Sequence, residues 1–121
     1  MVIRQGDVHW LHFFGIGSEP AGRRPAIVVQ ADHFNRSAIN TVVVAAITSN
    51  LRLGEMPGNV RLRKGEGGLA QPSVVNVSQL RTVDRSRLAD RIGSVGDDRM
   101  AQILDGLALL LGIEGRDAHV T

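Results

Sequence analysis

The segment that most constrains the fold is a nearly continuous apolar run in the middle of the chain. Residues Thr41–Thr48 read TVVVAAIT, with no charged side chain among them. A strand that lacks polar residues on both faces is buried on both, and β-branched valine and isoleucine favour extended backbone. A chain of 121 residues is long enough for one hydrophobic core. The run therefore predicts the central strand of a small β-barrel.

Shorter β segments flank this run on both sides. Turns rich in glycine and polar residues separate them and leave little room for helices, which is typical of a compact barrel. The expected strands are Asp7–Phe14, Ala26–Gln30, Asn59–Arg63, Ser73–Val77, Leu80–Val83 and Arg91–Val95, with a turn or short helix at Ala31–Ala38 and a helical turn at Asp84–Leu88. Pro25 is expected to open its strand, because proline suits the first residue of a strand.

One longer helix is expected, and it lies near the C-terminus. Apolar residues recur there at helical intervals behind Asp97, which we place at the N-cap. They are Met100, Ile103, Leu104, Leu107, Leu110 and Leu111. Residues 113–121, after Gly112, have no period and are expected to fray. The prediction is a mainly β fold with a C-terminal α-helix, in a single domain over residues 1–112.

Composition and motifs exclude several classes of site. The chain has no cysteine, so disulfides, thiolate zinc sites and cysteine nucleophiles are ruled out. Its histidines are scattered, and His9 and His12, three apart on a strand, are expected on opposite faces. No phosphate-binding, dinucleotide or serine-hydrolase motif is present. We expect no metal and no cofactor.

No targeting or membrane segment is recognisable in the sequence. No apolar run approaches the roughly 20 residues that a membrane helix needs, and residues 1–7 lack the apolar stretch of a signal peptide. We therefore expect a soluble, cytoplasmic protein without a membrane partner.

Basic charge is concentrated in the middle of the chain. The net charge is +2, and Lys64 is the single lysine beside thirteen arginines. Residues 52–91 hold eight basic and four acidic side chains, whereas residues 92–121 hold two and five. Guanidinium groups form forked contacts with phosphates and carboxylates. The basic stretch is consistent with a nucleic-acid surface, or with a solvated arginine-rich face.

Polar side chains gather on the loops and strand ends. They are Ser18, Glu19, Arg23, Arg24, Thr48, Ser49, Gln79 and Arg81. Each could be structural when taken singly. Arg24 could be a surface charge, Thr48 could bond to its own backbone, and Gln79 could satisfy a neighbouring loop.

Four motifs in order resemble the MazF/PemK/Kid family of toxin ribonucleases, from Arg4 to Leu111. RQGDVHW at residues 4–10 is similar to the family's opening R-x-G-D-[IV]-x-[WFY] strand. GSEPAGRRPAIVV at residues 17–29 is close to its G-S-E-x-x-G-x-R-P-x-[LIV]-V-[LIV] signature. AAITS at residues 45–49 resembles its apolar strand ending in threonine, and QLRTVD at residues 79–84 its Q-[LIV]-[RK]-[ST]-[LIV]-D segment. Phe13–Ile16 depart from the family's aspartate and proline at this point, so the loop's path and the preferred RNA sequence are expected to differ.

The resemblance implies an SH3-like small β-barrel of the CcdB/PemK type with a C-terminal helix. It also implies a homodimer that cleaves single-stranded RNA, above all mRNA, at a short sequence without a metal, and so inhibits translation and growth. Arg24 and Thr48 match the positions that carry catalysis in the family, and we add Glu19 as a candidate base. The expected substrate-binding residues are Ser18, Phe13, Ser49, Gln79 and Arg81. Trp10 is expected in the core.

The chemistry of ribonucleotides is compatible with such a site. The 2′-hydroxyl is a built-in nucleophile, so an enzyme that aligns it with the phosphate needs neither a metal nor a covalent residue. The expected products carry a 2′,3′-cyclic phosphate and a 5′-hydroxyl. A bidentate guanidinium from Arg24 and a hydroxyl from Thr48 would stabilise the phosphorane oxygens.

Two alternatives remain open at this stage. A CcdB-like toxin that poisons DNA gyrase by binding would not need Arg24 and Thr48 together, and a non-catalytic RNA-binding barrel would need no reacting groups. For a ribonuclease toxin, we expect a cognate antitoxin whose acidic, partly disordered tail covers the arginine-rich groove and orders on binding.

Overall fold

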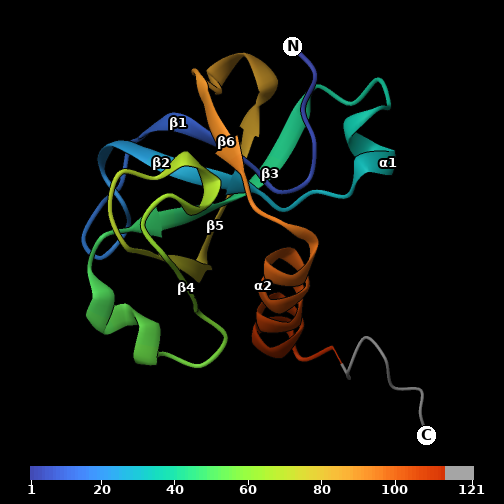
Figure 1. Ribbon diagram of the computed structural model, residues 1–121. Helices are drawn as coiled ribbons and strands as arrows, with labels where there is room; N and C mark the ends of the chain where they lie inside the picture. The colour runs from blue at the N-terminus through green and yellow to red at the C-terminus, as the bar shows by residue number, and fades with distance from the viewer. Residues whose placement is uncertain (114–121) are drawn as a thin grey trace, which may run out of the picture.

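A computed structural model describes residues 1–113 and shows a curled antiparallel sheet with one long helix packed below it (Figure 1). Within those residues six strands pair in the order β4-β5-β3-β2-β1-β6. The strands are β1 (Asp7–Phe13), β2 (Gly22–Val28), β3 (Thr41–Thr48), β4 (Val60–Leu62), β5 (Ser73–Asp84) and β6 (Arg91–Ser94). The helices are α1 (Asp32–Asn35) and α2 (Asp97–Leu111), with 3-10 turns η1 (Leu51–Glu55), η2 (Glu66–Gly68) and η3 (Arg85–Arg87). The predicted mainly β fold with a C-terminal helix is confirmed.

β3 is central in the sheet and buried on both faces, as its composition predicted. It pairs with β2 on one side and with β5 on the other. On one face Val42, Val44 and Ala46 join a core cluster that includes Leu11. On the other face, alternate residues of the same strand join a second cluster that includes Ile103 of α2. A continuous apolar run is therefore needed here because both faces of the strand are covered.

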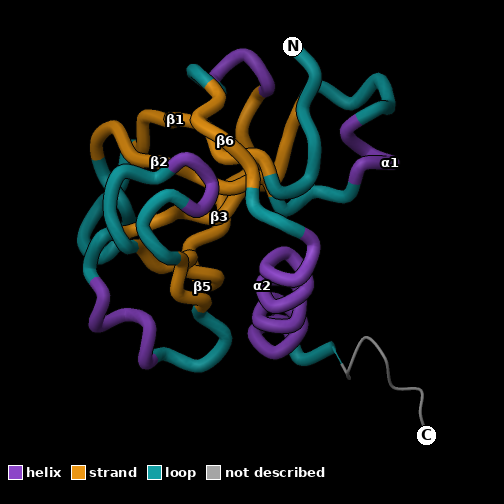
Figure 2. The backbone as a smooth tube through the Cα atoms, in the orientation of Figure 1, coloured by secondary structure: helices purple, strands orange, loops and turns teal. Residues whose placement is uncertain are grey.

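The two edges of the sheet approach each other through η2. A β-carbon added to Gly93 of β6 would lie 2.7 Å from the carbonyl of Gly67, and one added to Gly68 would lie 2.3 Å from the carbonyl oxygen of Ile92. Only glycine permits this contact between backbones. Figure 2 shows η2, as a helical segment, lying against the strand β6, so the curled sheet forms a half-barrel.

Two expected strands turn out to be one. The segments Ser73–Val77 and Leu80–Val83 belong to the single twelve-residue strand β5. The pairing with β3 shifts inside it, because Ala45 faces Leu80 whereas the next residue, Ala46, faces Asn76. Extra residues accommodated in this way form a β-bulge, which bends a strand without ending it. The polar interval between the two apolar segments is therefore a bulge, not a break.

β2 begins earlier than predicted. It starts at Gly22, so Pro25 lies inside the strand and not at its first residue. Residues 22–27 of the strand pair with β1, but the strand pairs with β3 only from Ala26 onward. The missing N–H of Pro25 is tolerated because no neighbouring strand needs it on that side.

α2 begins at Asp97, one residue earlier than predicted, because the residue expected at the N-cap is already helical. Gly96, with an extended backbone, occupies the N-cap without a side-chain hydrogen bond, and Asp97 lies in the first turn. A carboxylate there still interacts favourably with the positive end of the helix dipole. Gly112 ends the helix in the left-handed conformation, which glycine adopts without strain. The described residues stop at Ile113, so the expected fraying of 113–121 lies almost wholly outside them.

His9 and His12 face opposite sides of β1, as their spacing predicted. His9 is buried and its Nδ1 donates to the carbonyl of Ala89, 2.9 Å away, whereas His12 is exposed. No helix in the described part of the chain combines the length and the apolar character that crossing a membrane requires.

Candidate active site

The register of β2 and β3 brings Arg24 and Thr48 together. The last residue pair between β2 and β3 joins Ala26 to Ala46. Two residues further along each strand the side chains return to the same face, and these residues are Arg24 and Thr48. The two candidate catalytic residues therefore occupy the next cross-strand position, just beyond the last pair of β2 and β3.

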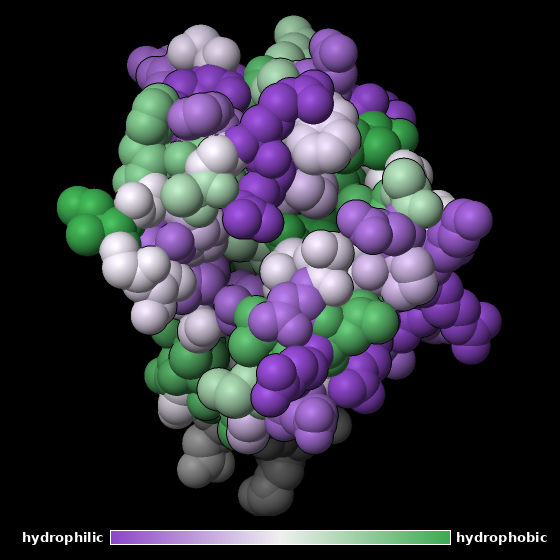
Figure 3. Space-filling view, turned by 90° about the vertical axis from the view of Figure 1, so that its left-hand side faces the viewer, coloured by the Kyte–Doolittle hydropathy of each residue, from purple (hydrophilic) through white to green (hydrophobic). Residues whose placement is uncertain are grey.

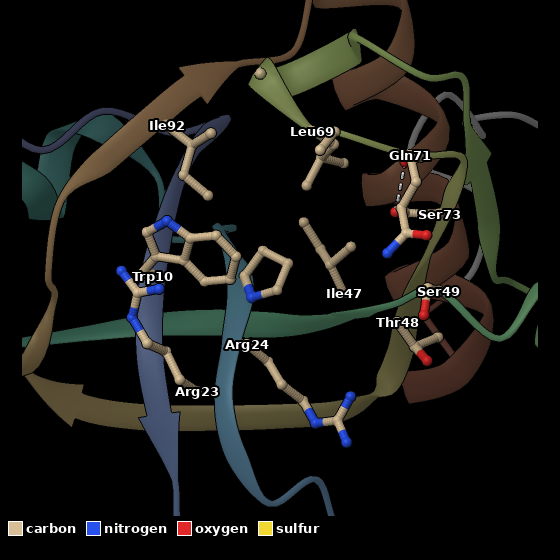
Figure 4. A pocket seen from close by; sticks show the side chains of 13 residues that line it. Trp10, Arg23, Arg24, Ile47, Thr48, Ser49, Leu69, Gln71, Ser73 and Ile92 are labelled. Atoms are coloured by element: carbon tan, nitrogen blue, oxygen red, sulfur yellow. Dashed lines mark hydrogen bonds between the residues drawn. The ribbon is translucent and has the colours of Figure 1, made fainter.

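Two adjacent pockets meet at this pair. We call the first, of about 290 Å³, the tryptophan pocket, and the second, of about 250 Å³, the glutamate pocket. Arg24, Ile47 and Thr48 line both of them. Figure 4 shows the tryptophan pocket, with Trp10 at one end and Thr48 at the other. Together the pockets form one groove with Arg24 and Thr48 at its middle.

The groove opens at the end of the sheet where β1 connects to β2. Figure 3 looks at this side of the molecule and shows hydrophilic side chains spread across it, around a hollow near its middle. The connecting loop supplies part of the wall of the glutamate pocket, including Ser18 and Glu19. This side is therefore a polar, hollowed surface that a charged substrate can reach.

The Arg24 side chain is fixed at one nitrogen and free at the other two. Its Nε donates to the carbonyl oxygen of Ala21 at 2.8 Å. Among residues 1–113, neither terminal nitrogen has a hydrogen-bond partner or a carboxylate within ion-pair distance. The side chain is also exposed. It presents an oriented, unpaired guanidinium fork, which suits an oxyanion such as a phosphate.

The Thr48 hydroxyl is bonded to backbone, as the structural interpretation of this residue expected. Its Oγ1 accepts a hydrogen bond from the N–H of Asn50 at 3.1 Å. A hydroxyl that accepts one bond still carries its own proton as a donor. The backbone bond therefore fixes the oxygen and leaves the O–H group available to a molecule in the groove.

Glu19 closes the loop on which it lies. Its Oε1 accepts from the N–H of Ile16 at 2.8 Å, and its own N–H donates to the carbonyl of Ile16 at 3.1 Å. The same carboxylate oxygen is 3.9 Å from Nη2 of Arg81. Arg81 thus holds the loop from β5, although it does not itself line either pocket.

The other predicted binding residues divide into two groups. Ser18 and Gln79 line the glutamate pocket, and Ser49 lines the tryptophan pocket. Phe13, in contrast, is 2% exposed and packs in the same core cluster as Leu11. The prediction that Phe13 contacts substrate was wrong, because a side chain buried in the core cannot stack on a base.

Trp10 is a wall of the groove and not a core residue as predicted. It is partly exposed and lines the tryptophan pocket, and the guanidinium carbon of Arg23 lies 4.3 Å from its ring centroid. Asn76 and Gln71 also line the two pockets and were missed. The alternation along β1 does not separate a pocket wall from core. Trp10 lies at the pocket because it pairs with Pro25, the residue after Arg24, and the sequence alone does not show that pairing.

Cationic side chains outnumber carboxylates around the groove. Arg23 and Arg24 line it and Arg81 stands behind its loop, whereas Glu19 is the one carboxylate among the described residues that line either pocket. Residues 1–113 contain no cluster of three or more histidine, aspartate or glutamate side chains that could hold a metal ion. The arrangement can bind a phosphate chain and stabilise negative charge on it.

These features define a small half-barrel with an arginine–threonine groove, and comparisons place it in a known family. Residues 4–111 match the family of PemK-like, MazF-like toxins of type II toxin-antitoxin systems, to which the chain therefore belongs. The chain is 40% identical over 114 residues to Endoribonuclease MazF2 of Mycobacterium bovis, a match that covers 93% of this chain and all of that protein.

Solved structures show the same fold. One is an endoribonuclease in complex with its cognate antitoxin from a mycobacterial species, with a TM-score of 0.76, 25% identity, and coverage of 93% of this chain and 98% of the other. Another is MazF from Deinococcus radiodurans, with a TM-score of 0.76, 30% identity and the same coverage. The resemblance that the four motifs predicted is confirmed, and the gyrase-binding alternative is not favoured.

Proposed function

We propose that this protein is the toxin of a type II toxin-antitoxin system and acts as an endoribonuclease on single-stranded RNA, mRNA above all. Its relatives are named endoribonucleases over nearly the whole length of the chain. The observation that carries the proposal is the groove, in which the unpaired fork of Arg24 and the hydroxyl of Thr48 stand together between two pockets. Pockets on both sides of this pair suit an RNA strand that continues past the reacting phosphate.

The reaction is an attack of the RNA's own 2′-hydroxyl on the adjacent phosphorus. The new bond closes a 2′,3′-cyclic phosphate, the bond to the 5′-oxygen breaks, and that oxygen leaves as a hydroxyl after gaining a proton. Negative charge builds on the phosphoryl oxygens in between. Arg24 and Thr48 stabilise this charge, and each such donor typically contributes about 3–4 kcal/mol to the transition state.

Glu19 is the proposed general base. It lines the same pocket as Arg24 and Thr48, and its carboxylate is the group that takes the proton of the 2′-hydroxyl when the loop brings the two together. Guanidinium groups keep their proton at neutral pH, so Arg24 acts as a cation and not as a base. Ser18, Gln79 and Ser49 are proposed to contact the nucleotides on either side.

The proposed partners are a cognate antitoxin and a second copy of the chain. The related mycobacterial structure is a complex with a cognate antitoxin, and the cationic groove here suits an acidic tail. The end of α2 leaves Leu109, Leu110 and Leu111 exposed among the described residues, which supports a homodimer. We place the functional domain at residues 1–112 and the protein in the cytoplasm.

The test is cleavage of a long unstructured RNA by purified protein in excess EDTA. The wild type is expected to give discrete fragments with 2′,3′-cyclic phosphate and 5′-hydroxyl ends. Arg24→Ala is expected to be slower by about 10²–10³-fold, whereas Arg36→Ala, which removes the exposed arginine directly after α1, keeps full activity. Intact RNA after incubation with folded, antitoxin-free wild type would refute the ribonuclease and leave the gyrase-binding or RNA-binding alternatives.

A further inference from the structure

Beyond the groove, aromatic and cationic side chains continue along the outer ends of β1 and β2. We call this set the ladder. Its members, in the order in which they contact one another, are Trp10, Arg23, His12, Phe14 and Arg87.

Each member of the ladder contacts the next one or, for Arg23 and His12, lies opposite it on the paired strand. The guanidinium of Arg23 lies over Trp10, and Arg23 is the cross-strand partner of His12. The rings of His12 and Phe14 are 4.5 Å apart between centroids and tilted by 55°. The guanidinium carbon of Arg87 is 5.3 Å from the Phe14 ring, and its Nη2 donates to the carbonyl of His12 at 2.8 Å. Arg87, which lies on η3, thus fixes the Phe14 end of the ladder.

The ladder is exposed and its charge is not neutralised. Phe14 is 75% exposed, although burial of a phenylalanine ring normally stabilises a protein. Arg23 and Arg87 are exposed as well, and within residues 1–113 neither has a carboxylate at ion-pair distance. The Phe14 ring and the two guanidinium groups are therefore accessible to a ligand on this surface.

The ladder starts inside the groove and leads away from it. Trp10 and Arg23 line the tryptophan pocket together with Arg24 and Thr48. Phe14 is four residues further along the chain than Trp10, or about 13 Å in extended backbone. An RNA strand that passes from the reacting phosphate to Phe14 must therefore span more than one nucleotide.

We propose that the ladder binds the single-stranded RNA that flanks the cleaved bond, with bases stacked on its rings and phosphates paired with Arg23 and Arg87. The proposal rests on the ribonuclease function above. The ladder combines aromatic rings with cations, as RNA combines bases with phosphates, and base–aromatic stacking tolerates any base. An acidic peptide would use the cations alone and leave the exposed rings without a role.

The test uses RNA substrates that share the cleavage sequence mapped with the wild type. One substrate lacks flanking nucleotides, and the others carry a single-stranded flank on the 5′ or the 3′ side. Phe14→Ala is the main variant, with Arg87→Ala beside it. Phe34→Ala is the matched control, because Phe34 is 53% exposed and contacts a histidine ring, that of His33. Phe34 lies on α1, on the opposite side of the sheet from the β1–β2 connection (Figure 1).

Phe14→Ala is expected to raise KM by at least about fivefold for one of the flanked substrates, the lower limit for losing one stacked base. The same variant leaves kcat, and KM for the unflanked substrate, within about twofold of wild type. Binding of a non-cleavable RNA with a 2′-deoxy sugar at the cut site weakens in parallel. Phe34→Ala changes none of these values.

Two results would overturn the proposal that the ladder binds flanking RNA. Equal KM values for flanked RNA in wild type and Phe14→Ala would show that no base stacks there. A loss in Arg87→Ala alone, removed by salt, would show a purely electrostatic surface that an acidic antitoxin tail could use equally. Both results require an active wild type, so they differ from failure of the proposed function, in which the wild type itself leaves RNA intact.

Discussion

The role of Thr48 can be tested with two substitutions that separate its hydroxyl from its shape. Thr48→Val replaces the hydroxyl with a methyl group and keeps the β-branched shape that suits the end of β3. Thr48→Ser keeps the hydroxyl and loses the methyl group. Both roles need the hydroxyl, so they are distinguished by what Thr48→Val loses: a structural role lowers stability, whereas a catalytic donor lowers the rate.

The size of the effect follows from the two bonds that the hydroxyl can make. Its oxygen accepts from the N–H of Asn50 at 3.1 Å, and Asn50 is exposed, so water can replace that acceptor. The expected loss of folding free energy in Thr48→Val is about 1 kcal/mol or less, a fall in Tm of no more than about 8 °C. In the transition state, loss of one preorganised donor lowers kcat by about 10²–10³-fold.

The assay is single-turnover cleavage of a short RNA under saturating enzyme, with thermal unfolding measured in parallel. Thr48→Val is expected to lose about 10²–10³ in rate with RNA affinity nearly unchanged, and Thr48→Ser to stay within about tenfold of wild type. If Thr48→Val cleaves as fast as Thr48→Ser, the hydroxyl only ends its strand. If it weakens binding and leaves the rate intact, Thr48 contacts the ground state and not the transition state.

Three further predictions concern the base and the scaffold. Glu19→Gln keeps an oxygen that can close the loop but cannot take a proton, so the single-turnover rate is expected to fall by about 10²-fold or more with unchanged affinity for non-cleavable RNA. The Arg99 guanidinium, which bonds both carboxylate oxygens of Glu66, holds the pKa of that carboxyl below its usual 4.5. The pair therefore stabilises the fold above about pH 4.5 and loses this contribution as pH falls through the lowered value. Glu66→Gln should cost about 1–2 kcal/mol at pH 7 and flatten the acid limb in urea unfolding. Gly106→Ala should destabilise the protein by about 1–3 kcal/mol, despite the higher helix propensity of alanine, because its β-carbon would lie 2.0 Å from the carbonyl oxygen of Gly58; an unchanged urea midpoint would contradict this packing.

The strands were predictable because their periodicity reports burial directly. β3 was predicted with the right bounds, since an uninterrupted apolar run has one reading in a small barrel. The bulge in β5 was not, because it depends on how β3 pairs with Asn76 and Leu80, and polar residues at a bulge look like a loop in the sequence. Similarly, the full length of β2 depends on its pairing with β1, which no local pattern encodes.

The site was predictable where a motif fixed it and less so where geometry decides. Arg24 and Thr48 could be paired from the family motifs, and the register of the sheet now supplies a physical reason. The burial of Phe13 and the exposure of Phe14 could not be predicted, because both faces of β1 carry apolar residues and the sequence does not show which face is covered. Trp10 was misplaced for a related reason, since a half-barrel leaves the end of one core face open as a pocket.

The position of the groove follows from where the pairing between β2 and β3 ends. Pairing stops at Ala26 and Ala46, and Pro25, the next residue of β2, has no N–H with which to extend it. Arg24 remains held by β1, where it faces Leu11, while its other side is left without a strand. The register therefore aims the Arg24 and Thr48 side chains at the same point, and the missing pairing leaves pockets on both sides of them. One proline thus serves two demands of the proposed site: fixed positions for the proposed reacting groups and an open path for a polymeric substrate.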